Sequence, residues 1–406
     1  MPEVTKKAPV IRFKGFSDAW EQRKLGDDKD VRDGTHDSPK YHKEGHPLVT
    51  SKNLNDYGLD MTDVSLISDA DFEAINKRSK VDNGDILFGM IGTIGNPVIV
   101  DRSDFAIKNV ALIKEGGDIP NRFLIQLLKS SVFEKYIRNE NAGNTQKFLG
   151  LSKIREFTFF TPTTEEQIRI ATFFKQLDDT IALHQRKLTL FNQLKETYLK
   201  QMFPQNEENM SVLRFADFSE PWEQRKWSET VDISTEMVNP KTGEYDSLPH
   251  IGPGNIESFT GRILDNVKSV KEDNLISGKF HFYPGDVIYG KINPQLGKYA
   301  MVDFEGLASA DSYVLNTKNG VSQTFLFTIL QGTSFYKYSV SVSMRTGMPK
   351  INRDELNQYS YSAPSIVEQE KIGHFFQQLD DTSALHQEKI AHLKVLKSTL
   401  LNKMFI

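Results

Sequence analysis

EQIRIATFFKQLDDTIALHQ, residues 166–185, returns near the end of the chain as EQEKIGHFFQQLDDTSALHQ, residues 368–387. The two copies lie 202 residues apart, and 14 of their 20 aligned positions are identical. A second pair has the same offset: RFKGFSDAWEQRK at 12–24 and RFADFSEPWEQRK at 214–226. A long repeat of this kind means that one folding unit is used twice. We therefore predict two similar units in tandem.

Composition narrows the class of protein. The 406 residues are 38% hydrophobic and 26% charged, which is typical of soluble globular proteins. Each half of the chain is long enough to bury a core of its own. The absence of Cys excludes a disulfide framework, a Cys-ligated zinc site and a thiol nucleophile. The N-terminus has no apolar signal segment and no stretch could span a membrane, so we expect a cytoplasmic protein without a membrane partner.

The repeated stretches predict two long helices, which we place at 164–203 and 367–406. Apolar residues recur through each stretch in alternating steps of three and four, the spacing of a coiled-coil seam. Each helix would be about 60 Å long at 1.5 Å per residue. We expect the two helices to pair antiparallel, with Thr164 as the first N-cap. His184 and His386 occupy equivalent seam positions, where a polar residue can set the register.

The stretches beside these helices predict mixed domains at 1–163 and 204–366. Turn and strand signals occur at VRDGTHDSP (31–39), at GDILFG (84–89) and at GDVIYG (285–290). Helical periodicity follows at 122–137 and 325–338. The predicted fold class is α+β: two similar globular domains separated by a pair of long antiparallel coiled-coil helices, with an internal pseudo-twofold repeat.

Charge is distributed unevenly along the chain. The net charge of -4 argues mildly against a nucleic-acid binder. However, no acidic residue lies between Glu140 and Glu156, or across the 42 positions between Asp311 and Asp354. Contact with a polyanion selects for Lys and Arg and against acids. These windows are therefore candidate DNA surfaces, and the alternative is a solvated basic face. The candidate DNA-contacting residues are Asn144, Gln146, Lys147, Lys153, Lys337, Arg345, Lys350 and Arg353.

No motif for a chemical reaction is complete in this sequence. GDVIYGKI at 285–292 approaches a phosphate loop, but Ile292 stands where the loop needs Ser or Thr. No glycine-rich loop for adenosylmethionine is present. His36, His42 and His46 cluster in a turn-rich stretch without a matching acidic or Cys partner, so we interpret them as surface residues and predict no metal site.

These motifs together resemble the specificity (S) subunit of bacterial type I restriction-modification enzymes. The resemblance rests on the FxxxWEQRK entries, on VRDGTHDSP, on GDILFGMIGTIG at 84–95 and on the two EQxxIxxFFxQLDD helices, and it covers essentially the whole chain. It implies that each domain is a target recognition domain that reads one half of an asymmetric double-stranded DNA site. It also implies that the helices dock two modification subunits, and that restriction subunits complete the complex.

In that family the S subunit has no catalytic activity, and adenosylmethionine, ATP and Mg²⁺ act on the partner subunits. The residues that we assign to docking and helix spacing are Phe173, Phe174, Leu177, His184, Phe375, Phe376, Leu379 and His386. Two alternatives stay open. One is a single-chain restriction-modification enzyme, which the missing motifs disfavour. The other is a protein scaffold without DNA binding, which the acid-free windows disfavour.

Overall fold

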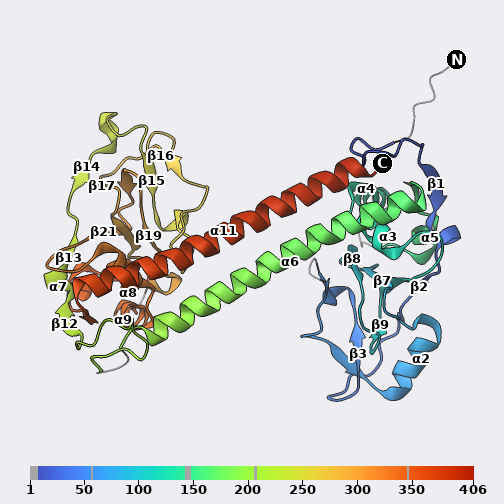
Figure 1. Cartoon of the computed structure of the whole chain (residues 1–406), viewed down its shortest axis with the longest axis horizontal. Helices are drawn as coiled ribbons and strands as arrows, with labels where there is room; N and C mark the ends of the chain where they lie inside the picture. Colours follow the sequence, from blue (N-terminus) through green and yellow to red (C-terminus); the bar gives the residue numbers. More distant parts are fainter. Residues whose placement is uncertain (1–7, 56–57, 142–147, 205–207, 345–346) are drawn as a thin grey trace. The chain divides into compact units, whose positions relative to one another are not determined.

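The chain forms two compact units (Figure 1). The computed structural model describes residues 8–55, 58–141, 148–204, 208–344 and 347–406. The first unit comprises residues 1–184 and 389–406, and the second comprises residues 185–388. The units cut across both predicted helix segments, so each unit contains part of each long helix.

The first unit combines short helices with mainly antiparallel sheets, in which only β3 and β9 pair parallel among the described strands. Its strands are β1 (Glu21–Lys24), β2 (Val31–Asp33), β3 (His46–Val49), β4 (Leu54–Asn55), β5 (Gly58–Leu59), β6 (Ser65–Ile67), β7 (Ile86–Gly89), β8 (Gly95–Ile99), β9 (Ala106–Ile107), β10 (Val110–Ile113) and β11 (Thr158–Thr161). Its short helices are α1 (Leu25–Asp28), α2 (Asp69–Ser79), α3 (Asn121–Leu128), α4 (Ser131–Glu140) and α5 (Leu151–Glu156). The central sheet has the order β2-β10-β7-β8.

The second unit repeats this plan. Its strands are β12 (Glu223–Lys226), β13 (Val231–Ile233), β14 (Met237–Val238), β15 (Pro249–Ile251), β16 (Lys268–Ser269), β17 (Lys279–Phe282), β18 (Val287–Gly290), β19 (Tyr299–Met301), β20 (Gly306–Ala308), β21 (Ser312–Thr317) and β22 (Ser360–Ala363). Its short helices are α7 (Trp227–Thr230), α8 (Gln323–Gln331), α9 (Thr333–Ser343) and α10 (Arg353–Asn357), with a 3-10 turn η4 (Pro294–Leu296). The order β13-β21-β18-β19 matches the sheet of the first unit.

The repeat extends to strand register. Glu21 pairs with Thr161 across β1 and β11, and Glu223 pairs with Ala363 across β12 and β22. Both residues of the second pair lie 202 positions after those of the first. The predicted α+β class and internal repeat are thus confirmed, and the two hexamers predicted as strands form β7 and β18.

Three local predictions are corrected by the structure. The helix predicted at 122–137 is two helices, because the Ser130 hydroxyl accepts the Val132 amide at 3.3 Å and starts α4 anew. The helix predicted at 325–338 is also two helices, because Gly332 ends α8 in an extended conformation and α9 starts after it. The turn predicted at 31–39 begins as strand, because β2 pairs with β10 and Thr35 is then bridged to Lys108.

Two long helices, α6 (Thr164–Gln201) and α11 (Ile366–Met404), confirm the central prediction. Thr163, and not Thr164, holds the N-cap position of α6, since its carbonyl accepts the Gln167 amide at 2.9 Å. The helices run antiparallel within each unit. In the second unit, for example, Tyr198 of α6 packs on Phe375 and Phe191 packs on His386.

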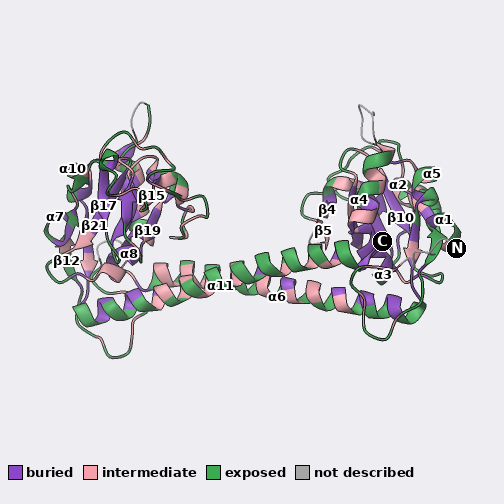
Figure 2. Ribbon diagram, turned by 90° about the horizontal axis from the view of Figure 1, so that it is seen from above, coloured by how far each residue is buried: buried purple, intermediate pink, exposed green. Residues whose placement is uncertain are grey.

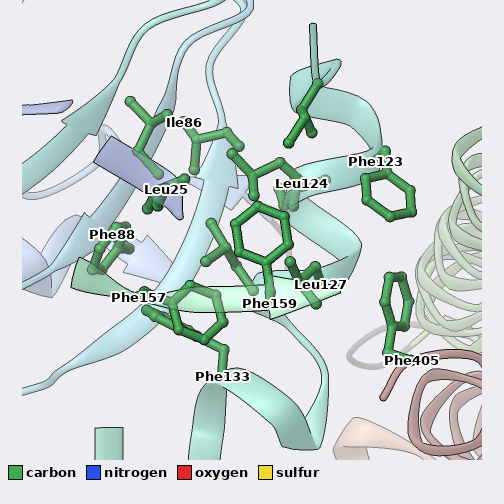
Figure 3. Close-up of a cluster of buried hydrophobic side chains, with 14 of the residues drawn as sticks. Leu25, Ile86, Phe88, Phe123, Leu124, Leu127, Phe133, Phe157, Phe159 and Phe405 are labelled. Carbon is green, nitrogen blue, oxygen red and sulfur yellow. The ribbon is translucent and has the colours of Figure 1, made fainter. Parts of the chain in front are cut away.

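The C-terminal end of each long helix closes a core (Figure 2). Met404 and Phe405 are 3% and 4% exposed in the first unit, although they end the second repeat. Figure 3 shows the Phe405 ring facing Phe123, and their centroids lie 5.6 Å apart. Phe203, which ends the first repeat, packs in the same way on Trp222 and Phe325 of the second unit. Each core is therefore completed by the helix end of the other repeat.

Buried ion pairs tie each entry motif to the start of a long helix. Arg12 donates to both carboxylate oxygens of Glu166, at 2.8 and 2.7 Å. Arg214 repeats the arrangement on Glu368, at 2.7 Å for each bond. Both glutamates are fully buried. A buried carboxylate needs such a partner, which explains why the entry motif and the helix start agree between the two repeats.

Candidate nucleic-acid interface

A group of cations lies at the end of β18 in the second unit. The chain after β18 pairs with the segment 349–351: the Ile351 amide donates to the Lys291 carbonyl at 3.0 Å, and Ile292 is bridged to Lys350. This pairing joins two stretches far apart in sequence. The Lys291 ammonium lies 5.2 Å from the ring centroid of Tyr313, and the Arg353 guanidinium carbon lies 5.6 Å from the same centroid.

No carboxylate neutralises this group directly. Within the described ranges, Lys291, Lys350 and Arg353 form no ion pair with an acidic side chain. Burial lowers the pKa of Lys291, and the charges of Lys350 and Arg353 lower it further, against an opposing effect of Asp311. Lys337 on α9 is exposed and also has no ion pair among the described residues. Positive charge without internal partners is what a phosphate backbone attracts.

Arg353 has a second task within the fold. Its guanidinium donates to the carbonyls of Ile233 and Ser234 at 2.8 and 2.6 Å, which holds α10 to the end of β13. Arg155 does the same in the first unit by donating twice to the Val31 carbonyl. Sequence reasoning missed this anchoring role. Because Arg155 and Arg353 are not related by the 202-residue offset of the repeat, the repeat carried no signal for this role.

The other predicted DNA residues divide into two groups. Lys153 is exposed but lies 3.4 Å from both Glu140 and Glu156, the acids that bound its window, so it is partly neutralised. Asn144, Gln146, Lys147 and Arg345 lie outside the described residues. A DNA contact at each of these positions stays a prediction.

The equivalent surface of the first unit carries different chemistry. Ile91 is bridged to Phe148 as Ile292 is to Lys350, and the Leu149 amide donates to the Met90 carbonyl. Met90 and Phe148 thus stand where the second unit has Lys291 and Lys350. Phe148 is 47% exposed. Met90 is fully buried, so the same backbone frame exposes the ring of Phe148 in the first unit and Lys350 in the second.

The predicted docking residues lie largely inside the units. Phe174 and Phe376 are fully buried, and Phe173 packs on Phe13 with ring centroids 5.7 Å apart. Phe375 packs likewise on Phe215, and Leu177 and Leu379 pack against the two cores. Their side chains hold the helices to the units, and Phe173, Leu177, Phe375 and Leu379 are half-buried. Docking of another subunit at these residues stays a prediction.

The helix register has a determinant that the sequence reasoning missed. Lys397 donates to Asp178 at 2.5 Å in the first unit, and Lys195 donates to Asp380 in the second. These pairs are equivalent under the 202-residue offset. Burial raises the pKa of Asp380, while Lys195 opposes that shift. His184 and His386 are half-buried seam residues, and His386 stacks on Phe191 with centroids 5.5 Å apart. The ion pairs therefore share the register-setting role predicted for the histidines.

One repeated apolar residue stays exposed on each long helix. Leu183 and Leu385 occupy the same position of the duplicated ALHQ segment and are 51% and 62% exposed. Leu190 of α6 is also 54% exposed, but its counterpart is His392. Among the described residues of the two long helices, Leu183 and Leu385 thus form the exposed apolar pair that is repeated.

The three histidines near the N-terminus are engaged by local contacts. The ring of His36 contacts Asn109 and Asp33 at 2.8 and 3.0 Å, and these contacts raise its pKa. His46 contacts Asp69 at 2.9 Å and stacks on Phe72. In the part of the chain that the structure describes, no group of three or more His, Asp or Glu side chains is arranged to hold a metal ion.

None of the helices in the same ranges combines the length and apolar composition needed to cross a bilayer.

Comparison with known proteins gives one consistent result. The family model for the type I restriction modification DNA specificity domain matches twice, at residues 17–193 and 219–395. The chain is 27% identical over 316 residues to the specificity subunit of the type I restriction enzyme EcoDI from Escherichia coli, covering 71% of this chain and 70% of that protein. It is 21% identical over 412 residues to the MjaIX specificity subunit from Methanocaldococcus jannaschii, covering 95% and 92%.

A solved structure has the same fold. The S subunit of a type I restriction-modification system from M. genitalium superposes with a TM-score of 0.66, covering 98% of this chain and 99% of that one. The sequences are 14% identical, so this likeness concerns the fold alone.

Proposed function

Because this chain belongs to the family of type I restriction modification DNA specificity domains, we propose that each unit reads one half of a bipartite DNA target. The observation that carries this proposal is the cation group of Lys291, Lys350 and Arg353, which forms no ion pair with a carboxylate among the described residues, together with the exposed Lys337 of α9. Because equivalent surface positions differ between the units, the two half-sites should differ in sequence. The target is therefore asymmetric.

The chain itself has a binding role and no catalytic one. Methyl transfer from adenosylmethionine, and ATP- and Mg²⁺-dependent translocation and cleavage, belong to modification and restriction subunits. The duplicated helices support docking of two copies of one modification subunit, since a repeated surface suits a repeated partner. Leu183 and Leu385 are the residues that we assign to this contact, in place of the buried phenylalanines.

Neutralising two of the free cations tests DNA contact. In a Lys337→Gln/Lys350→Gln variant, binding to duplex DNA is expected to weaken. The slope of log K against log salt should become shallower by about 2, because each phosphate contact contributes about 0.9. Fluorescence anisotropy over a range of salt concentrations measures both quantities.

The matched control removes the same charge elsewhere in the second unit. Lys268 and Lys271 lie 3.8 and 3.7 Å from Asp273 and Asp246, so their charges are already paired. A Lys268→Gln/Lys271→Gln variant should keep the wild-type slope. If both double variants change the slope equally, the effect is one of net charge and the assigned surface is wrong.

Replacing the exposed leucines by lysine tests the docking of modification subunits. Leu183→Lys is expected to leave one modification subunit bound in place of two, and Leu183→Lys/Leu385→Lys to leave none. Burying a charge at an interface centre costs at least about 2 kcal/mol of binding free energy. Native mass spectrometry of the co-expressed complex counts the subunits. Leu190→Lys is the control, because its position is equally exposed and not repeated. Two subunits retained by the double variant would exclude this surface.

A further inference from the structure

Two apolar side chains are exposed beside the cation group of the second unit. Phe259 is 51% exposed, and Leu296, the last residue of η4, is 45% exposed. The Phe259 amide donates to the carbonyl of Gly297, the residue after Leu296, at 2.9 Å. Adjoining segments of the chain thus present the two side chains, which we call the apolar pair.

The backbone at Phe259 is strained and fixed in place. Its φ is +65°, which is rare for a residue with a bulky side chain. Besides the bond to Gly297, the Phe259 carbonyl accepts the Tyr299 hydroxyl at 3.0 Å. A Cβ on Gly297 would lie 2.5 Å from the Phe259 ring, so Gly leaves room for the ring where another residue would not. Backbone strain of this kind persists where the surroundings fix it, and it clusters at ligand-binding sites.

Cations accompany the apolar pair on two chain segments. On one segment, Lys291 lies three residues before η4. On another, the Phe259 ring packs edge to face on Tyr336 with centroids 5.6 Å apart, and Lys337 follows Tyr336 directly. The exposed apolar pair therefore belongs to the surface whose positive charge attracts phosphate groups.

The first unit has a shorter loop at the equivalent place. Each loop follows a 3-10 turn, at 51–53 in the first unit and at 253–255 in the second. Leu54 pairs with Leu59 across the first loop, and Ile256 is bridged to Ile263 across the loop that carries Phe259. The second loop is thus two residues longer. The apolar pair belongs to the divergent part of the chain, where differences in base recognition are expected.

We propose that Phe259 and Leu296 contact the 5-methyl group of a thymine in the half-site that the second unit reads. Such recognition rests on the proposed DNA-binding function and adds one base that is read. Among the groups that base pairs present in the major groove, the thymine methyl is the apolar one, and side chains such as Phe recognise it. The polar edges of the other bases would lose water against this surface without gaining a hydrogen bond.

The packing of the Phe259 ring favours contact with a methyl group over insertion of the ring between base pairs. An inserted apolar side chain acts as a wedge that unstacks neighbouring bases, so it has to project from the protein. Tyr336 and Gly297 cover part of the Phe259 ring, which is only half exposed. A half-exposed ring on a fixed backbone suits contact with a group at the edge of a base.

Replacing thymine by deoxyuridine removes the methyl group alone and tests this contact base by base. Sequencing of methylated adenines first defines the target, and each thymine of the half-site assigned to residues 228–366 is then replaced in turn. Fluorescence anisotropy measures how the full-length chain, in complex with its modification subunits, binds each duplex. We expect one replacement to weaken binding by about three- to fivefold, the effect of one buried methyl group.

Variants of the apolar pair assign that effect to these residues. Phe259→Ala should abolish the difference between the thymine and uracil duplexes at the sensitive position, and Phe259→Leu should retain part of it. Leu296→Ala leaves the strained loop unchanged and should also reduce the difference, so the test does not depend on one variant folding. Ile276→Ala is the control, because Ile276 is 76% exposed in the same unit and outside the apolar pair. It should keep the full difference.

Three results would contradict the thymine contact. One is binding that no uracil replacement weakens, and another is a uracil effect of wild-type size in both Ala variants. The third is loss of a modification subunit from Phe259→Ala, counted by native mass spectrometry, which would assign the apolar pair to protein docking. Absence of binding to every duplex would overturn the proposed function itself, whereas binding without a methyl effect would overturn the thymine contact alone.

Discussion

Phe405→Ala is expected to destabilise the first unit by about 3–5 kcal/mol and to leave the second unit unchanged. The residue is 4% exposed, and its ring contacts Trp20, Phe123 and Phe174 of the first unit. Truncating a buried Phe leaves a cavity and removes that amount of stability. Hydrogen exchange resolved by mass spectrometry should show lost protection in peptides of the first unit, more than 200 residues away in sequence.

Two variants serve as controls for this result. Val395→Ala changes a residue of the same helix that is 64% exposed, so stability should stay within about 0.5 kcal/mol of wild type. Phe203→Ala is the equivalent change in the other repeat, and it should reduce protection in the second unit. Loss of protection in both units from Phe405→Ala would contradict the assignment of the end of α11 to the first core and of the end of α6 to the second.

Exchange of residues 27–163 for the block of another specificity subunit is expected to change one half of the methylated DNA motif completely. The exchange keeps β1, the Arg12–Glu166 ion pair and both long helices, which support the block without belonging to it. Sequencing of methylated adenines in cells that express the chimera with its modification subunit measures the result.

The reciprocal exchange is the control for this prediction. Replacing residues 228–366 should change the other half of the motif and preserve the first. A chimera that altered both halves, or a motif that did not change at all, would show that the blocks do not read independently.

The repeat made much of the fold predictable. A stretch that recurs with the same spacing must serve the same structural role twice, and α6 and α11 lie within one or two residues of their predicted starts. The hexamers at β7 and β18 were found for the same reason. Even the Arg12–Glu166 pair could have been inferred, since Arg214 and Glu368 repeat both residues with the same separation.

The sequence did not predict which core the end of each long helix packs against. Apolar periodicity shows which face of a helix is buried, but it does not show against which unit. Met404 ends α11 and Phe405 follows it in sequence, and yet both complete the first core. That choice depends on the antiparallel pairing of the two helices, and the Asp178–Lys397 and Lys195–Asp380 pairs that favour one register connect residues about 200 positions apart.

The candidate site was only partly predictable for a similar reason. Acid-free windows located Lys337 and Lys350, because the charge pattern is local. They could not show that Arg353 is engaged by backbone carbonyls, or that Lys291 from another stretch joins the group.

Sequencing of methylated adenines tests whether the two units read two different half-sites of one DNA target. The intact chain would be co-expressed with one modification subunit in a host without other adenine methylation. We predict a single bipartite motif, with two different half-sites, a gap of unspecified bases between them and one methylated adenine in each half. A palindromic or uninterrupted motif, or methylation that does not depend on this chain, would contradict it.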